Sequence, residues 1–318
     1  MRTSSALLFA LKAVLAAVTL GLLVRFVEVD AMGTVLAHAR LELAWVALAL
    51  VPVSVGLEVY RWWRLVRRVS PDVRYRDALV AVLGGYPLGL LTPGRVGEYV
   101  GRAALLTEVP AGHAAALTFA DKMATLAAVL VGGLVALGHY LGTVVEPSPL
   151  WPSVVFATTL ATGVLLLAIL FPSGARAALG TVLPFAPVRR AVASFDAIPQ
   201  HEAALLLALS FVRYLVFSGQ FVLMVLALAP GTSPFAAAAG VALVYFAKSA
   251  VHSITLGDLG IREGAAVFFL GAYGVPEAAA LEASLGVFAI NLLLPALVGV
   301  PLLLRIRLRA RSASALAP

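Results

Sequence analysis

Residues 84–106 read GGYPLGLLTPGRVGEYVGRAALL and lie within one of the most hydrophobic parts of the chain. Glycine and proline are dense over residues 84–94, and both disfavour a continuous helix, because proline lacks an N–H donor and glycine loses the most backbone entropy. Directly after this break come Arg95, Glu98 and Arg102, which fall on one helix face at about 100° per residue. Broken backbone and ionisable side chains at membrane depth mark a cavity or a substrate path. This stretch is therefore the main candidate site.

A second stretch repeats the pattern. The sequence TPGRVG of residues 92–97, followed by Glu98, corresponds to TLGDLG of residues 255–260, followed by Glu263. The matching glycines are 163 residues apart, Gly94 with Gly257 and Gly97 with Gly260. Paired hydrophobic segments interrupted by Gly or Pro in two matching halves indicate a transporter binding site. In so glycine-rich a chain, chance similarity is the alternative.

Composition places the chain among helical membrane proteins. Its mean hydropathy is +1.00, and 12% of its residues are charged, against roughly 25% in soluble domains. The absence of cysteine excludes disulfides, thiol nucleophiles and thiolate metal sites. The net charge of +7 comes from arginines in short loops and at the C-terminus, where they orient helices, and is not a nucleic-acid signal.

Hydropathy predicts six full spans, since one span needs about 20 apolar residues. They are residues 5–24, 43–59, 114–137, 151–171, 203–228 and 282–304. A signal peptide is the alternative for the first, but no convincing cleavage site precedes Arg25. Residues 78–106 and 235–273 are too broken to cross twice, so we expect each to form a re-entrant hairpin.

Positive charge predicts which loops are cytoplasmic. Arginines crowd residues 60–77, recur in residues 172–202 and end the chain in the basic tail 305–318. In the first of these segments we interpret Trp62 and Trp63 as interfacial belt residues and the arginines as a cytoplasmic anchor. A lipid-headgroup patch is the weaker alternative.

The two halves then have the same order and opposite orientation. Repeat one, about residues 5–137, begins inside, and repeat two, about residues 151–304, begins outside. We expect an all-α polytopic membrane protein in which residues 1–318 form a single integral membrane domain. It is built from two inverted-topology repeats, each with three spans and a re-entrant helical hairpin. Both termini are expected to be cytoplasmic, in a plasma or inner membrane.

The first hairpin tip suits an anion. Thr92 can cap a helix that begins at Pro93, leaving free N–H groups at a positive helix end. Arg95 and Arg102 add donors whose geometry fits phosphate, and Glu98 would balance them in the empty site. We expect the lipid phosphate to bind among Arg95, Glu98, Arg102, Asp258, Arg262 and Glu263.

A wider set of residues could support that site. It comprises Thr92, Gly94, Gly97, Asp121, Lys122, Arg213, Lys248, His252, Gly257 and Gly260. In the alternative interpretation the charges only lock the hairpins, Asp121, Lys122 and Arg213 lie at the interface, and His252 is a hydrogen-bonded structural histidine. We expect no metal site, no cofactor and no nucleotide-binding motif.

TPGRVGEYVGR of residues 92–102 and GDLGIREGA of residues 257–265 resemble a flippase-like family. It contains the transmembrane region of lysylphosphatidylglycerol synthases and related stand-alone membrane proteins. The resemblance covers nearly the whole chain and implies a role in moving or handling an anionic lipid. Family members often have Pro-Gly-Gly where this chain has Leu256-Gly257-Asp258. No aminoacyl-transferase domain follows residue 318, so lipid lysylation by this chain alone is not expected.

Two other classes compete with a lipid flippase. A membrane enzyme that processes polyprenyl phosphates would need a Ser-Arg pair after its Pro-Gly, whereas here Arg95-Val96-Gly97 follows, and zinc-protease and serine-hydrolase motifs are absent. A non-transporting membrane partner of a separate synthase would tolerate neutral side chains at the tips. We favour a transporter that handles a phospholipid or polyprenyl phosphate.

The topology can be tested with single cysteines and an impermeant thiol reagent, since the chain has none of its own. We expect residues 61–76 and 176–190 and both termini to be protected from outside. Residues 139–149 and 230–234 should label. External labelling near Arg68 would contradict the orientation.

Overall fold

The computed structural model describes residues 35, 38–171, 198–250 and 260–303, and every regular element in these residues is helical. The elements are α3 (Leu41–Ala49), α4 (Val51–Val66), α5 (Tyr75–Leu90), the 3-10 turn η1 (Pro93–Arg95), α6 (Val96–Leu105), α7 (Ala111–Thr143), α8 (Trp151–Leu170), α11 (Gln200–Leu228), α12 (Pro234–Ala250), α13 (Ile261–Ala272), α14 (Glu277–Phe288) and the π-helical turn η3 (Ala289–Leu293).

Five helical stretches in the described residues are long and apolar enough to cross a membrane. They are Leu41–Val66, Ala111–Thr143, Trp151–Leu170, Gln200–Leu228 and Glu277–Leu303. They correspond to five of the six predicted spans, and the predicted first span, residues 5–24, lies outside the described residues. The prediction of an all-helical, multi-pass membrane protein is therefore confirmed.

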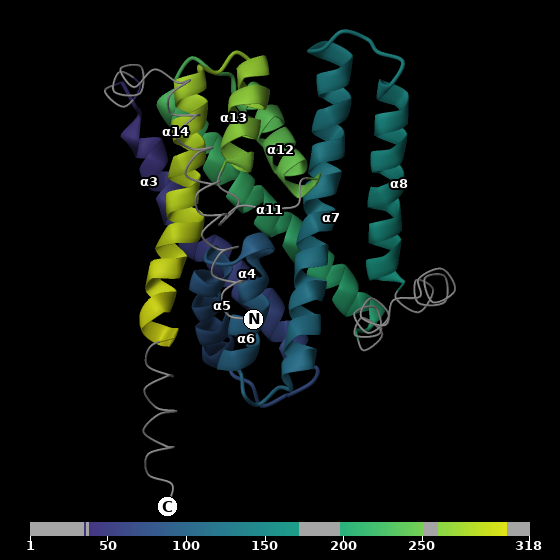
Figure 1. Ribbon diagram of the computed structural model, residues 1–318, viewed down its shortest axis with the longest axis vertical. Coiled ribbons are helices and arrows are strands. Elements are labelled where there is room, and N and C mark those ends of the chain that lie inside the picture. The colour runs from purple at the N-terminus through teal and green to yellow at the C-terminus, as the bar shows by residue number, and fades with distance from the viewer. Residues whose placement is uncertain (1–34, 36–37, 172–197, 251–259, 304–318) are drawn as a thin grey trace, which may run out of the picture.

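The two longest helices, α7 and α11, join two packed groups of helices. Figure 1 shows α4, α5 and α6 in the lower half of the molecule and α12, α13 and the start of α14 in the upper half, with α7 running past both. One apolar core lies among α4 to α7 and another among α12 to α14, and α11 contributes residues to each.

The two pairs of short helices approach the middle of the molecule from opposite ends. The connections from α4 to α5 and from α6 to α7 lie at the lower end in Figure 1. Those from α11 to α12 and from α13 to α14 lie at the upper end. The α5–α6 turn, the C-terminal end of α12 and the N-terminal end of α13 therefore point inward. Residues 251–259, which include Gly257 of the repeated motif, lie outside the described residues.

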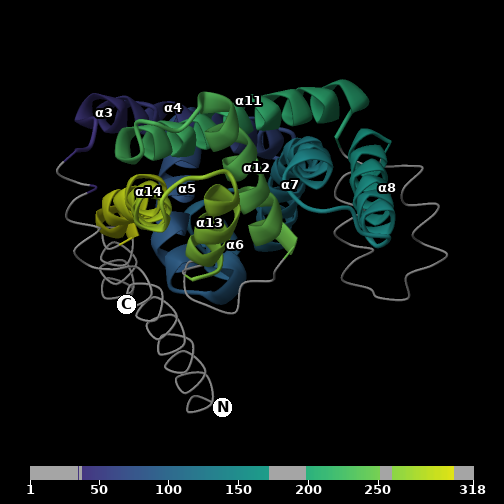
Figure 2. The same cartoon turned by 90° about the horizontal axis from the view of Figure 1, so that it is seen from above.

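Helix α8 stands at the edge of the bundle. Figures 1 and 2 both show it beside α7 and away from α3 and α14. Thr162 and Ile169 are its buried residues, and most of its apolar side chains are exposed. Such a surface suits lipid, because an apolar helix face that no protein covers is stable only in an apolar solvent.

The break in the first hairpin is narrower than predicted. Helix α5 continues through Gly84, Gly85, Pro87 and Gly89 to Leu90, and the break covers residues 91–95. The prediction that these four residues interrupt the helix was wrong. The glycines on α5 make room for α6, and the contact between the two helices compensates for the poor helix propensity of glycine.

Glycines bring α5 and α6 into close contact. At Gly97 a Cβ atom would overlap the backbone oxygen of Leu88, and at Gly101 it would lie 2.8 Å from the Cα of Gly85. Backbones of two helices can approach this closely only where side chains are absent. The first hairpin is therefore a tightly packed unit that fixes the residues at its turn.

We expect Gly97→Ala to lower the thermal unfolding midpoint of the detergent-solubilised protein, because overpacking costs about 1–3 kcal/mol. The matched control is Gly138→Ala in α7, where a Cβ meets nothing within 4 Å. The control should be neutral or slightly stabilising, since alanine favours helix. Equal midpoints for the two variants would contradict the close packing.

Candidate functional site

The charged face predicted after the helix break is present. Arg95 forms an ion pair with Glu98. Arg102, one turn further along α6, has its Nη2 atom 3.9 Å from Oε2 of Glu98. The guanidinium of Arg95 also lies over the ring of Tyr86, 5.5 Å from its centroid. The spacing of three charged residues on one face of α6 thus predicted their proximity correctly.

Glu58 of α4 lies at the centre of this group of charges. Its carboxylate accepts hydrogen bonds from Arg102, from Arg213 of α11 at 2.6 Å and from the Tyr86 hydroxyl at 2.7 Å. Lys122 of α7 places its Nζ atom 3.5 Å from the same carboxylate. Glu58 is 1% exposed, so these donors replace the water that an ionised carboxylate requires.

Arg61 joins the group through Asp121 of α7. Its Nε atom donates to the Asp121 side chain at 2.9 Å, and its Nη2 atom donates to the Asp121 backbone oxygen and to Thr125. The prediction that Arg61 belongs to a cytoplasmic anchor was wrong, because its side chain is buried in this pair. The prediction of Trp62 as a belt residue was also wrong: it is fully buried and donates to Thr118.

We call this set of linked side chains the charge cluster. Its five basic and three acidic members in the described residues are Arg61, Arg95, Arg102, Lys122 and Arg213 with Glu58, Glu98 and Asp121. When all are ionised, the cluster carries an excess of two positive charges. A buried excess of this kind is costly unless an anion offsets it.

The accessible part of the charge cluster is entirely basic. The side chains of Arg95, Lys122 and Arg213 are 26%, 24% and 14% exposed. The remaining members, including all three carboxylates, are 1% exposed or less. An approaching solute therefore meets positive groups first. The sequence left open whether three of these residues support the site or lie at the membrane interface. All three, Asp121, Lys122 and Arg213, belong to the charge cluster.

The turn before α6 differs from the predicted cap. Thr92 accepts the N–H of Gly97 at 2.6 Å and donates to the backbone of Leu88 at 2.8 Å. It thus links α5 to α6, but Pro93 lies in η1, and α6 begins at Val96 instead. Two consecutive residues in the left-handed region, Gly94 at φ 58° and Arg95 at φ 56°, reverse the chain here. This reversal separates Pro93 from the first turn of α6.

The second copy of the motif forms a smaller polar group. Arg262 pairs with Glu263 and donates to Ser284 of α14 at 3.0 Å. Glu263 also accepts the N–H of Gly260 at 2.7 Å, which ties the start of α13. Within the described residues, Arg262 forms its ion pair with its neighbour Glu263. The members of the charge cluster come from the first half and α11 instead, so the two groups are separate there.

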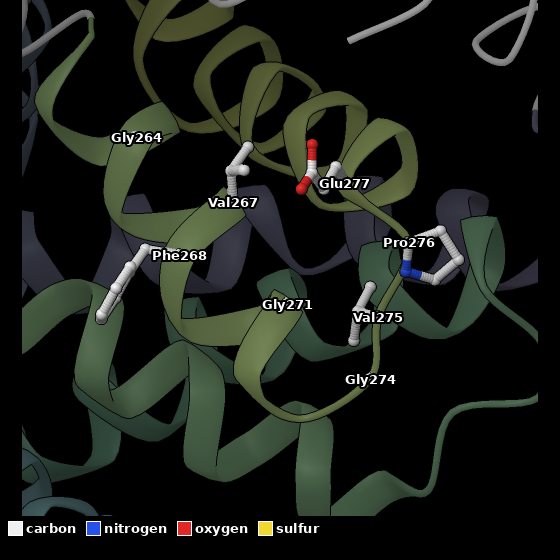
Figure 3. Close-up of a pocket in the computed structure, with 8 residues that line it drawn as sticks. All are labelled: Gly264, Val267, Phe268, Gly271, Gly274, Val275, Pro276 and Glu277. Carbon is white, nitrogen blue, oxygen red and sulfur yellow. The ribbon is translucent and has the colours of Figure 1, made fainter. Parts of the chain in front are cut away.

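Several predicted residues of the second copy cannot be placed. His252, Gly257 and Asp258 lie outside the described residues, and Lys248 occupies the last turn of α12. A separate hollow of about 550 Å³ opens beside α13, lined by its glycines, Val267, Phe268 and the connection to Glu277 (Figure 3). No member of the charge cluster lines this hollow.

Sequence reasoning missed Glu58 and Arg61 as site residues. Glu58 is the one acid within the predicted span 43–59, and an ionisable group inside a span is by default a functional candidate. That signal was available for Glu58. For Arg61 it was hidden, because five further arginines follow within residues 60–77 and resemble a loop signal.

We expect Asp121→Asn to lower the free energy of unfolding by about 3–5 kcal/mol, because it leaves Arg61 buried without its counter-ion. Asp72→Asn, at an exposed acid, is the control and should have little effect. The double variant Arg61→Met with Asp121→Leu should recover much of the loss in a denaturation series. No difference between Asp121→Asn and the control would contradict a structural pair.

No curated protein matches the chain. The family model described as the lysylphosphatidylglycerol synthase TM region matches residues 9–299 and so spans most of the sequence. This match confirms the resemblance carried by the two Gly-containing motifs. The chain therefore belongs to the lysylphosphatidylglycerol synthase TM-region family.

Proposed function

We propose that the protein moves an anionic, phosphate-bearing lipid across the membrane and binds its headgroup at the charge cluster. The observation that carries the proposal is the combination of an excess of two positive charges with an accessible side that is wholly basic. Membership of a family named for a phospholipid synthase supports the same ligand class. A lipid phosphate would supply the negative charge that the cluster lacks.

Glu98 is the group that a phosphate would displace. Two of the three accessible cations bind it: Arg95 of the first hairpin forms an ion pair with it, and Nζ of Lys122, on α7, lies 2.5 Å from it. Since the carboxylate is buried and the two cations are not, a phosphate arriving from the accessible side could take over these bonds. Glu98 then serves as the counter-ion of the empty site, and Arg95 and Lys122 as the ligands of the occupied one.

Arg102 has a different role in this proposal. It is fully buried and is bound by Glu58, so it positions the two carboxylates and does not meet the lipid directly. Its Nε and Nη1 atoms make no hydrogen bond within the described residues, nor does Nη1 of Arg61. Because a guanidinium stays protonated, Arg102 and Arg61 keep the interior of the cluster positive while the outer cations exchange partners.

We further propose that α5–α6 and α12–α13 are re-entrant hairpins of two inverted repeats. Their approach from opposite ends of the bundle supports this (Figure 1). A new correspondence supports it as well: Asp121 of α7 and Ser284 of α14 are 163 residues apart, the same offset as the glycines. Each binds an arginine, Arg61 in the first half and Arg262 in the second. In such a scheme Arg262 would bind the phosphate on the other side, and Glu263 would be its counter-ion in the empty site.

The test uses protein reconstituted into vesicles that contain fluorescent phosphatidylglycerol, with bleaching of the outer leaflet as the readout. Arg95→Ala should slow translocation about thirtyfold, since a charge-assisted hydrogen bond is worth on the order of 2 kcal/mol. Arg95→Lys should recover only part of the rate, because an ammonium cannot form the bidentate fork. Lys122→Gln should also slow transfer.

The matched control is Arg67→Ala, at an exposed arginine beyond the end of α4, and it should leave the rate unchanged. Zwitterionic fluorescent phosphatidylcholine should move more slowly than phosphatidylglycerol, because it brings no net negative charge. Wild-type rates in both Arg95→Ala and Lys122→Gln would mean that the charges are structural. A non-transporting role beside a separate synthase would then be the better explanation.

A further inference from the structure

A further buried acid, Glu282, lies apart from the charge cluster. It belongs to α14, inside the candidate span Glu277–Leu303, and is 9% exposed. Neither oxygen of its carboxylate has a hydrogen-bond partner among the described residues. It differs in this from Glu58, whose oxygens are bound by two arginines and a tyrosine.

Among the described residues of α11, α13 and η3, which pack against α14, none brings an unpaired charge to Glu282. Helix α11 carries no charged residue between Tyr214 and Leu228, and η3 carries none. Helix α13 carries Arg262 and Glu263, which bind each other and Ser284. On α14 itself the other acid is Glu277, which is exposed in the first turn. No ion pair therefore offsets a negative charge on Glu282 within the described residues.

An ionised carboxylate in this place would be very unfavourable, since it would lose its hydration without gaining a counter-ion. A metal ion is a poor remedy, because the described residues form no group of three or more His, Cys, Asp or Glu side chains. A proton needs only the one carboxylate. The neutral carboxylic acid is therefore the form that this environment favours.

We propose that Glu282 is a proton-binding site, and that its loading and release are coupled to the lipid movement proposed above. The step is the addition of one proton to one carboxylate oxygen and its later loss to water. Release requires Glu282 to reach water or a new partner, so the deprotonated form belongs to a different arrangement of α14. The coupling rests on the proposed function, whereas the protonation itself does not.

The position of Glu282 offers a route for that coupling. Two residues further along α14, Ser284 binds both Arg262 and Glu263, so a shift of α14 would disturb the polar group of the second half. The helix widens into a π-helical turn at Ala289–Leu293, within which Nδ2 of Asn291 also has no partner among the described residues. Such turns recur at functional sites in helices.

Protonation can be measured without lipid transport by infrared difference spectroscopy of the full-length protein in vesicles of phosphatidylglycerol and phosphatidylcholine. We expect a carboxylic-acid carbonyl band near neutral pH that is lost in Glu282→Gln and shifted in Glu282→Asp. Glu277→Gln is the matched control on the same helix and should retain the band. A band that survives unchanged in both Glu282 variants overturns the proposal.

Coupling is measured as the pH dependence of phosphatidylglycerol translocation in the same vesicles. On the side of the titration where the transport-competent form of Glu282 is the minor one, the wild-type rate should change by up to about tenfold per pH unit, as expected for one proton. Glu282→Gln cannot titrate and should give a flat profile, whereas Glu277→Gln should keep the wild-type profile. An unaltered profile in Glu282→Gln overturns the coupling.

The two proposals fail separately. If Arg95→Ala slows lipid transfer as expected, but substitution of Glu282 changes neither the infrared band nor the pH profile, the lipid site stands and the proton site does not. If the wild-type protein moves no lipid but Glu282 gives the band, the proton site stands and the proposed transport does not.

Discussion

The carboxylate of Glu58 is the point on which the packing of the first half depends. It sits within a helix long and apolar enough to span the membrane, where an unpaired charge would cost several kcal/mol. Its partners come from α5, α6, α7 and α11, so satisfying one side chain fixes four helices around α4. Hydrophobic burial alone could not specify these positions in lipid, since lipid tails are as apolar as leucine.

The two halves use their polar residues differently. The first half and α11 gather eight charged side chains into one connected group, whereas the second half holds a compact Arg262, Glu263 and Ser284 set. Where Asp121 stands in the first half, the uncharged Ser284 stands at the same offset in the second. Within the described residues, the excess positive charge is therefore concentrated in the first half and α11.

Hydropathy and local spacing predicted much of this arrangement. Long apolar runs located five spans, and the spacing of Arg95, Glu98 and Arg102 placed them on one face, because both signals are local. The pairing of Arg61 with Asp121 is not local, since 60 residues separate them, and one sequence carries no sign of it. The extent of α5 was also misjudged, because contact between glycines on α5 and α6 outweighs their intrinsic preference.

The edge position of α8 determines how freely its sequence can change. Thr162 and Ile169 are buried, and Leu165, Leu166 and Leu170 pack against the neighbouring core. Nearly any apolar side chain would satisfy the remaining positions. A substitution there need only preserve average hydropathy and length, whereas on α4 and α6 it must preserve individual contacts. Residues 151–170 are thus expected to diverge fastest among relatives, and their outward surface is where a probe or a fused domain would disturb the protein least.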